Sequence, residues 1–215
     1  MSHPTKLFMG SIRPLPPEGQ PTGIFKEEVQ GSVWLGREGL VGDAQADRRV
    51  HGGPDKALHQ YPVSHYARLA IAFPAAVGQL MPGSMGENLS VPGWDETNVC
   101  IGDSFRLGDA LIQISQPRSP CWKIDRRFGV EGMKALIQEQ GIIGWYYRVI
   151  EEGEVEPGCR FEHVERPVGT ITVARLLALW REPDLDRATL MELSSLPGLA
   201  TNWLGKIGDR LAKLG

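Results

Sequence analysis

The 215-residue chain has no apolar run long enough to cross a membrane, and its first residues lack the apolar core of a secretory signal. It contains 23 lysines and arginines against 26 aspartates and glutamates, a formal net charge of −3. Nucleic acids and anionic lipids attract proteins through a basic surface, and this composition provides none overall. These absences predict a cytoplasmic protein that binds neither a membrane nor nucleic acid.

Cysteine is scarce, since the chain has only Cys100, Cys121 and Cys159. An odd number at wide spacing excludes a disulfide framework and offers no C-x-x-C pair for zinc or an iron–sulfur cluster. The G-x-G-x-x-G fingerprint of dinucleotide sites is also absent. The sequence therefore shows no built-in electron donor.

Glycine and proline are abundant, with 26 and 16 residues, which suits short strands joined by turns. Phe105 and Leu107 alternate with polar neighbours, residues 111–115 are predicted as a second strand, and residues 107–110 between them are typical of a tight turn. Short strands of this kind fit a small barrel, which removes exposed sheet edges by closing on itself. Two short helices are predicted within this part, over residues 64–73, with Ser64 as the cap, and 130–138.

The composition changes after Pro167, where three amphipathic stretches begin. We predict a β-barrel domain over residues 1–167 and a small three-helix domain over residues 168–215, with Thr172 and Asp186 as helix caps. Helices this short are not stable alone, so they should bundle or pack on the barrel. Because the segment contains no histidine or cysteine, we expect no catalytic group from it.

Cys121 lies in a loop that follows a predicted strand. Arg118 and Lys123 flank the thiol and would stabilise a thiolate, while Pro117 and Pro120 stiffen the loop. A soft thiolate suits a redox-active metal. The alternative is a buried cysteine that serves only as a small apolar side chain. The other two cysteines lie in or beside predicted strands and are assigned to structure.

A Gly-Gly turn between His51 and Lys56 is the second candidate. Both Gly52 and Gly53 can adopt a positive φ and turn successive N–H groups to one side, which makes an anion-binding nest. Arg48, Arg49 and Lys56 add positive charge around it. The alternative is a hairpin turn with solvated charges.

Three histidines, His51, His59 and His65, follow one another at spacings that match no zinc template, so a zinc site is not predicted. His59 is assigned to packing. Asn88 either caps its own loop or binds the edge of a ring system, and Asp43 is first of all a turn residue.

Three blocks occur in a recognisable order: Gly39–Asp43 leading into His51–Ala57, then Gly86–Ser90, then Ser115–Cys121. With these blocks the chain resembles the MOSC domain family, the module shared with molybdenum-cofactor sulfurases, and most closely its bacterial YiiM-type members. The resemblance implies a mainly β fold: a closed MOSC-type β-barrel with a few short helices and a small C-terminal three-helix domain. It also implies a molybdenum cofactor (molybdopterin).

The resemblance further implies roles for particular residues. Cys121 would be the catalytic residue and the metal ligand. The pterin and its phosphate would be held by Arg48, Arg49, His51, Gly52, Gly53, Lys56, Asn88, Arg118 and Ser119. The implied reaction reduces N-hydroxylated small molecules, such as 6-hydroxylaminopurine, to amines, with electrons from a separate flavin-containing reductase.

Two other function classes remain open. Cys121 is also suited to holding a persulfide or the cofactor in a sulfur-transfer or cofactor-carrier protein. The third class is a binding module whose C-terminal helices engage nucleic acid or a partner. Residues 168–215 carry six basic and five acidic side chains, which makes the nucleic-acid version weak.

Overall fold

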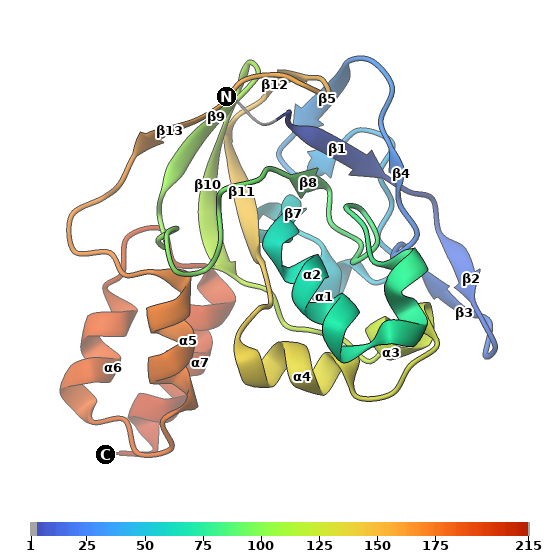
Figure 1. Cartoon of the computed structure of the whole chain (residues 1–215). Helices are drawn as coiled ribbons and strands as arrows, with labels where there is room; N and C mark the ends of the chain where they lie inside the picture. The colour runs from blue at the N-terminus through green and yellow to red at the C-terminus, as the bar shows by residue number, and fades with distance from the viewer. Residues whose placement is uncertain (1–3, 215) are drawn as a thin grey trace.

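A curled eight-stranded sheet dominates the computed structural model, which describes residues 4–214 except for the side chain of Arg49. Across the sheet its strands are β13 (Phe161–Glu165), β9 (Ser104–Leu107), β10 (Ala110–Pro117), β11 (Trp145–Glu151), β7 (Leu58–Gln60), β8 (Leu89–Ser90), β1 (Lys6–Met9) and β4 (Glu27–Glu28) (Figure 1). Neighbouring strands are antiparallel except for β7 and β8. Irregular register between β10 and β11, as at a β-bulge, helps the sheet to bend.

Two small sheets accompany the large one. One contains β12 (Gly153–Val155), β5 (Val33–Gly36) and β6 (Gly39–Leu40), and the other is the hairpin of β2 (Arg13–Leu15) and β3 (Gln20–Thr22). The predicted mainly β fold is confirmed, and so is the turn between β9 and β10. The barrel itself is confirmed in part, because the sheet curls into a half-barrel whose edge strands β13 and β4 do not pair with each other in the described residues. The β4 edge is only two residues long and carries two exposed glutamates, features that protect an open sheet edge.

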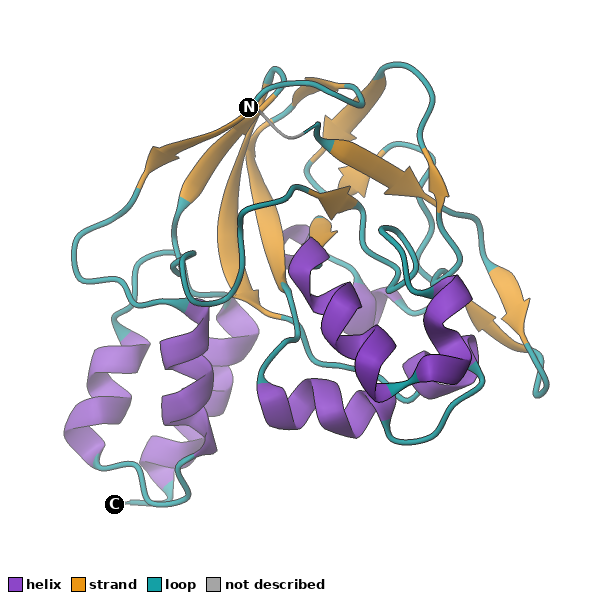
Figure 2. Ribbon diagram, viewed as in Figure 1, coloured by secondary structure: helices purple, strands orange, loops and turns teal. Residues whose placement is uncertain are grey.

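Short helices cover one side of the sheet (Figure 2). They are α1 (Arg48–His51), α2 (Val63–Ala72), α3 (Lys123–Phe128) and α4 (Met133–Gln140), with 3-10 turns at Pro54–Lys56 and Pro74–Gln79. Two of them were predicted, but Ser64 does not cap α2, because the helix already starts at Val63 after Pro62. The other begins at Met133, later than predicted, because Gly132 has a left-handed φ of 86°. None of the helices in residues 4–214 is long and apolar enough to span a bilayer.

The C-terminal part consists of α5 (Val173–Arg181), α6 (Arg187–Ser194) and α7 (Thr201–Ala212), which form a group separate from α2–α4 (Figure 1). The predicted three helices and both predicted caps are confirmed: the Thr172 and Asp186 side chains accept from the third backbone N–H of α5 and α6, respectively. Leu176, Trp203 and Ile207 belong to the same buried cluster as the apolar side chains of the sheet. The helices therefore pack on the sheet and complete its core.

Asp55 links the loop of the Gly-Gly motif, residues 51–57 (the motif loop), to β11 and to the start of α7. One carboxylate oxygen accepts from the Nε of Arg148 in β11 at 2.9 Å, and the other accepts from the backbone N–H of Thr201 at 3.1 Å. Arg148 also donates to the carbonyl of Gly198 at 2.8 Å. These bonds fix the start of α7 against the motif loop and β11.

Candidate active site

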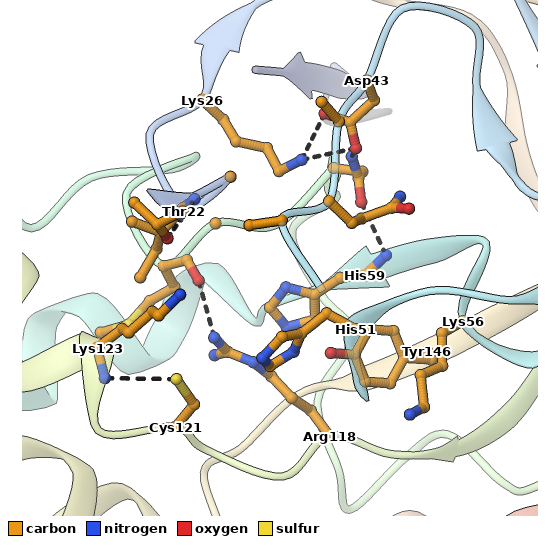
Figure 3. Close-up of a pocket in the computed structure, with 18 residues that line it drawn as sticks. Thr22, Lys26, Asp43, His51, Lys56, His59, Arg118, Cys121, Lys123 and Tyr146 are labelled. Carbon is orange, nitrogen blue, oxygen red and sulfur yellow. Dashed lines mark hydrogen bonds and ion pairs between the residues drawn. The ribbon is translucent and has the colours of Figure 1, made fainter. Parts of the chain in front are cut away.

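The thiol of Cys121 opens into a cavity bounded by the motif loop, β7 and the segments before β4 and α3 (Figure 3). Basic side chains dominate its wall: Lys26, His51, Lys56, His59, Arg118 and Lys123. Among the described residues that line it, Asp43 is the only carboxylate. The cavity is therefore suited to an anionic ligand.

Cys121 is half-buried at the end of the loop that leads into α3. The backbone N–H of Lys123 donates to its sulfur at 3.3 Å, which places a partial positive charge at the sulfur. Burial raises the pKa of the other two thiols, Cys100 and Cys159, which keeps them protonated at neutral pH. Of the three cysteines, Cys121 is the one that lines this cavity.

Arg118 contributes a cation with unused hydrogen-bonding capacity. The residue is only 9% exposed, and its Nη2 donates to the carbonyl of Met85 at 3.1 Å. Its buried Nη1 has no partner among the described residues. A buried N–H without an acceptor is costly, so this position is suited to an acceptor supplied by a bound molecule.

Lys26 and Asp43 form a buried ion pair at the other end of the cavity. The Nζ of Lys26 lies 2.5 and 2.7 Å from the two carboxylate oxygens of Asp43, and Asp43 also accepts from the backbone N–H of Gly10 at 2.9 Å. Burial lowers the pKa of Lys26, and the charge of Asp43 opposes this shift. Asp43 is thus the counter-ion of Lys26 as well as a turn residue.

Asn88 lies in the wall of the cavity with its amide bonded to protein atoms. Its Nδ2 donates to Asp43 at 2.8 Å and to the carbonyl of Phe8 at 3.2 Å. Its Oδ1 accepts from the backbone N–H of His59 at 3.2 Å. Both N–H groups are used, so this side chain organises the cavity and has no free donor for the edge of a ring.

His51 and His59 are both neutral at pH 7. Burial lowers the pKa of His51, helped by the charge of Arg118 and of nearby lysines. Burial and then Arg118 lower the pKa of His59 well below its usual 6.5. The His59 ring lies 5.4 Å from that of Tyr146, and its buried Nε2 has no partner among the described residues. The neutral ring is therefore packed into the cavity wall, with its Nε2 beside Gly144.

Because the pKa of His59 is lowered in the folded protein, we expect the stability of the protein to depend on pH. As the pH falls through about 6.5, the unfolded chain binds a proton at His59 while the folded protein does not, so the free energy of unfolding decreases. The loss approaches about 1.4 kcal/mol per pH unit for one such histidine. Urea unfolding at about pH 7.5 and 5.5 measures it, and His59→Gln should show a smaller difference between the two conditions. An identical difference in the variant would contradict this assignment.

The Gly-Gly turn differs from the predicted nest. Only Gly53 has a positive φ, 92°. Gly52 lies directly after α1, where an added Cβ would approach the Cα of Arg48 to 3.0 Å. The prediction of a positive φ at Gly52 was therefore wrong, because this glycine is needed for a close contact of the helix end.

The structure brings some of the predicted site residues together and separates others. His51, Lys56, Asn88, Arg118 and Cys121 line the cavity. The exposed Arg48 pairs with Glu38, the Arg49 side chain lies outside the described part, and Ser119 lines a second cavity. Sequence reasoning did not assign Lys26, His59 or Tyr146 to the site. For His59 the sequence did contain a usable signal, because this residue lies close to the Gly-Gly motif.

A family model described as the MOSC domain matches residues 47–162, more than half of the chain and including Cys121. The chain belongs to the MOSC family. A second model, described as the YiiM-like, 3-alpha helix domain, matches residues 171–214 of this MOSC protein. MOSC proteins constitute a molybdenum-cofactor-binding family.

Individual relatives agree with this membership. The Escherichia coli K12 protein named YiiM is 42% identical over 204 residues, which are 94% of this chain and 90% of that protein. The crystal structure of YiiM from Escherichia coli superimposes with a TM-score of 0.83 at 35% identity, covering 100% of this chain and 94% of that one. A longer Gibberella moniliformis protein named Reductase is 33% identical over 178 residues, 82% of this chain but 31% of that protein.

Proposed function

We propose that this MOSC protein is a molybdenum-cofactor-dependent reductase that converts N-hydroxylated small molecules, including N-hydroxylated purine bases, to amines in the cytoplasm. The observation that carries the proposal is the half-buried thiol of Cys121 in a cavity lined by cations. A thiolate is a suitable ligand for a soft, redox-active metal, and the cations suit the phosphate of a pterin cofactor.

The residues of the cavity fit such a cofactor. Cys121 would bind the metal, and Arg118 and Lys123 would hold the phosphate and the polar edge of the pterin. The unpartnered Nη1 of Arg118 offers a hydrogen bond to it. Within residues 4–214 no group of three or more His, Cys, Asp or Glu side chains is placed to hold a metal ion. A metal beside Cys121 therefore has to bring further ligands of its own, as a pterin dithiolene does.

The reaction takes up two electrons and two protons, because R–NHOH becomes R–NH₂ and water. The bound cofactor supplies the two-electron chemistry. Burial raises the pKa of Tyr146, so its phenol keeps its proton and can donate a hydrogen bond into the cavity. The neutral His51 can hold or pass on a proton at the same wall. The protein thus orients the substrate and provides proton donors close to the thiol.

The electrons are proposed to come from a separate flavin-containing reductase. The longer Gibberella moniliformis relative is named a reductase, and most of its length lies outside the part that this chain matches. This supports a two-component arrangement, in which the MOSC protein provides the reducing site and another protein provides the electrons.

The exposure of Cys121 also favours a second candidate, a sulfur-transfer or cofactor-carrier protein with a persulfide on this thiol. Analysis of a single protein preparation distinguishes the two candidate functions. Protein made in a host that synthesises the cofactor is analysed for molybdenum, pterin and cyanide-releasable sulfur, and is assayed with 6-hydroxylaminopurine and an artificial electron donor. We expect molybdenum, pterin and turnover. Releasable sulfur without any reductase activity would support the second candidate instead.

A further inference from the structure

A second cavity, of about 250 Å³, lies between the motif loop and the first turn of α7. Its lining includes Lys56, Gln116, Ser119, Tyr146, Trp203 and Lys206. His51, Lys56 and Tyr146 line both this cavity and that of Cys121, so the two are neighbours along one wall. The C-terminal helices therefore contribute to a cavity beside the candidate active site, which the sequence did not indicate.

The charge of this second cavity is positive. Lys56 and Lys206 both line it, and none of its described lining residues is a carboxylate. Burial and then the charge of Lys206 lower the pKa of Lys56, which shows that the two cations act on each other. The opposing charge that acts on Lys56 is that of Asp55, which is bound by Arg148 at 2.8 Å. Two lysines that repel each other across a cavity favour a bound dianion between them.

The inner wall adds a hydrogen-bond acceptor and aromatic rings. Gln116 is only 2% exposed, and its Oε1 has no partner among the described residues. A buried acceptor without a donor suits an N–H or O–H group of a ligand. Tyr146 and Trp203 provide aromatic surface, and Ser119 provides a hydroxyl. The cavity thus combines features that recognise a polar heteroaromatic ring with features that recognise an anion.

We propose that this cavity is a phosphate subsite, through which the enzyme takes N-hydroxylated bases as their nucleoside monophosphates. The phosphate lies between Lys56 and Lys206, and the N-hydroxylated base extends past Tyr146 toward Cys121. This inference rests on the proposed reductase function for the chemistry at Cys121, but not for the binding of phosphate.

The phosphate is assigned to the substrate rather than to the cofactor for two reasons. The Cys121 cavity has its own cations for a cofactor phosphate, Arg118 and Lys123. Lys206 is exposed on α7, so its side of the cavity is accessible to a molecule that exchanges with solvent. A resident cofactor is better served by the more enclosed cations.

Binding to the full-length protein tests the subsite without any need for turnover. AMP and adenosine are titrated calorimetrically into the parent protein, Lys206→Glu and Lys213→Glu. Lys213 is an exposed lysine at the far end of α7 and serves as the matched control. AMP should bind the parent and the control more tightly than adenosine does. Lys206→Glu should weaken AMP about tenfold or more, as expected for the loss of a charged hydrogen bond, and leave adenosine unchanged.

Steady-state kinetics of the holoenzyme provide a second test. With the N-hydroxylated nucleoside monophosphate, Lys206→Glu should raise KM and leave kcat unchanged, and with the free base it should change neither. Three results would overturn the subsite: equal affinities for AMP and adenosine, equal behaviour of the two variants, or a lower molybdenum content in Lys206→Glu, which would assign the phosphate to the cofactor. A protein without reductase activity whose AMP affinity still depends on Lys206 contradicts the proposed function and upholds the phosphate subsite.

Discussion

Replacing Cys121 by serine is expected to abolish the reduction of N-hydroxylated bases while leaving the fold intact. The thiol lines the cation-rich cavity, and within the described part of the chain its sulfur accepts one hydrogen bond, from the backbone N–H of Lys123. Mutating residues behind a metal ligand already costs about 10–100-fold in affinity or activity, so removal of the ligand itself should cost at least about a hundredfold. Reductase activity with an artificial donor and molybdenum content are the measurements, beside a thermal melting curve.

The matched control is Cys159→Ser, because this thiol is also half-buried but does not line the cavity. It should retain the activity of the parent protein. A folded Cys121→Ser protein with full turnover would exclude Cys121 as the metal ligand. Equal losses in both variants would show that the effect is not specific to the cavity.

Replacing Asp43 by alanine is expected to lower the free energy of unfolding by about 3–5 kcal/mol, because it leaves the charge of Lys26 buried without its partner. The two side chains are only 5% and 2% exposed. Asp43 also bonds the backbone of Gly10 and the amide of Asn88, so three segments lose an acceptor together. Urea unfolding of the full-length parent and variant measures this difference in the free energy of unfolding.

An exposed ion pair provides the comparison. Lys6 and Glu28 lie 3.0 Å apart at the surface, so Glu28→Ala should cost no more than about 1 kcal/mol. The double variant Lys26→Met with Asp43→Leu should be less destabilised than Asp43→Ala, because no unpaired charge remains. If Asp43→Ala costs no more than Glu28→Ala, the buried pair does not stabilise the cavity.

Local patterns predicted the parts of the fold that depend on neighbouring residues. The hairpin of β9 and β10 follows from alternation of apolar residues and from Gly108, whose φ is 54°. Thr172 and Asp186 begin helices because their side-chain oxygens accept backbone N–H groups three residues later. The Cys121 loop was also found in this way, because its cations and prolines are adjacent in the sequence.

Other parts depend on contacts between distant segments, which no local pattern contains. Lys26 faces Asp43, and Asp43 faces Asn88, so this buried network combines residues from three separate segments. The short helix α3 was missed because it follows a segment rich in proline. The second cavity was missed for the same reason as the network, because the chain has to fold before Lys206 approaches Lys56.

The bonds of Asp55 and the core that the sheet shares with α5–α7 constrain how this protein can evolve. A descendant that lost the three helices would expose the apolar side chains that now pack against Trp203 and Ile207. It would also leave Asp55 without the N–H of Thr201. Several substitutions would have to arise together before such a loss was tolerated, so the curled sheet and the three C-terminal helices are expected to be inherited as one unit.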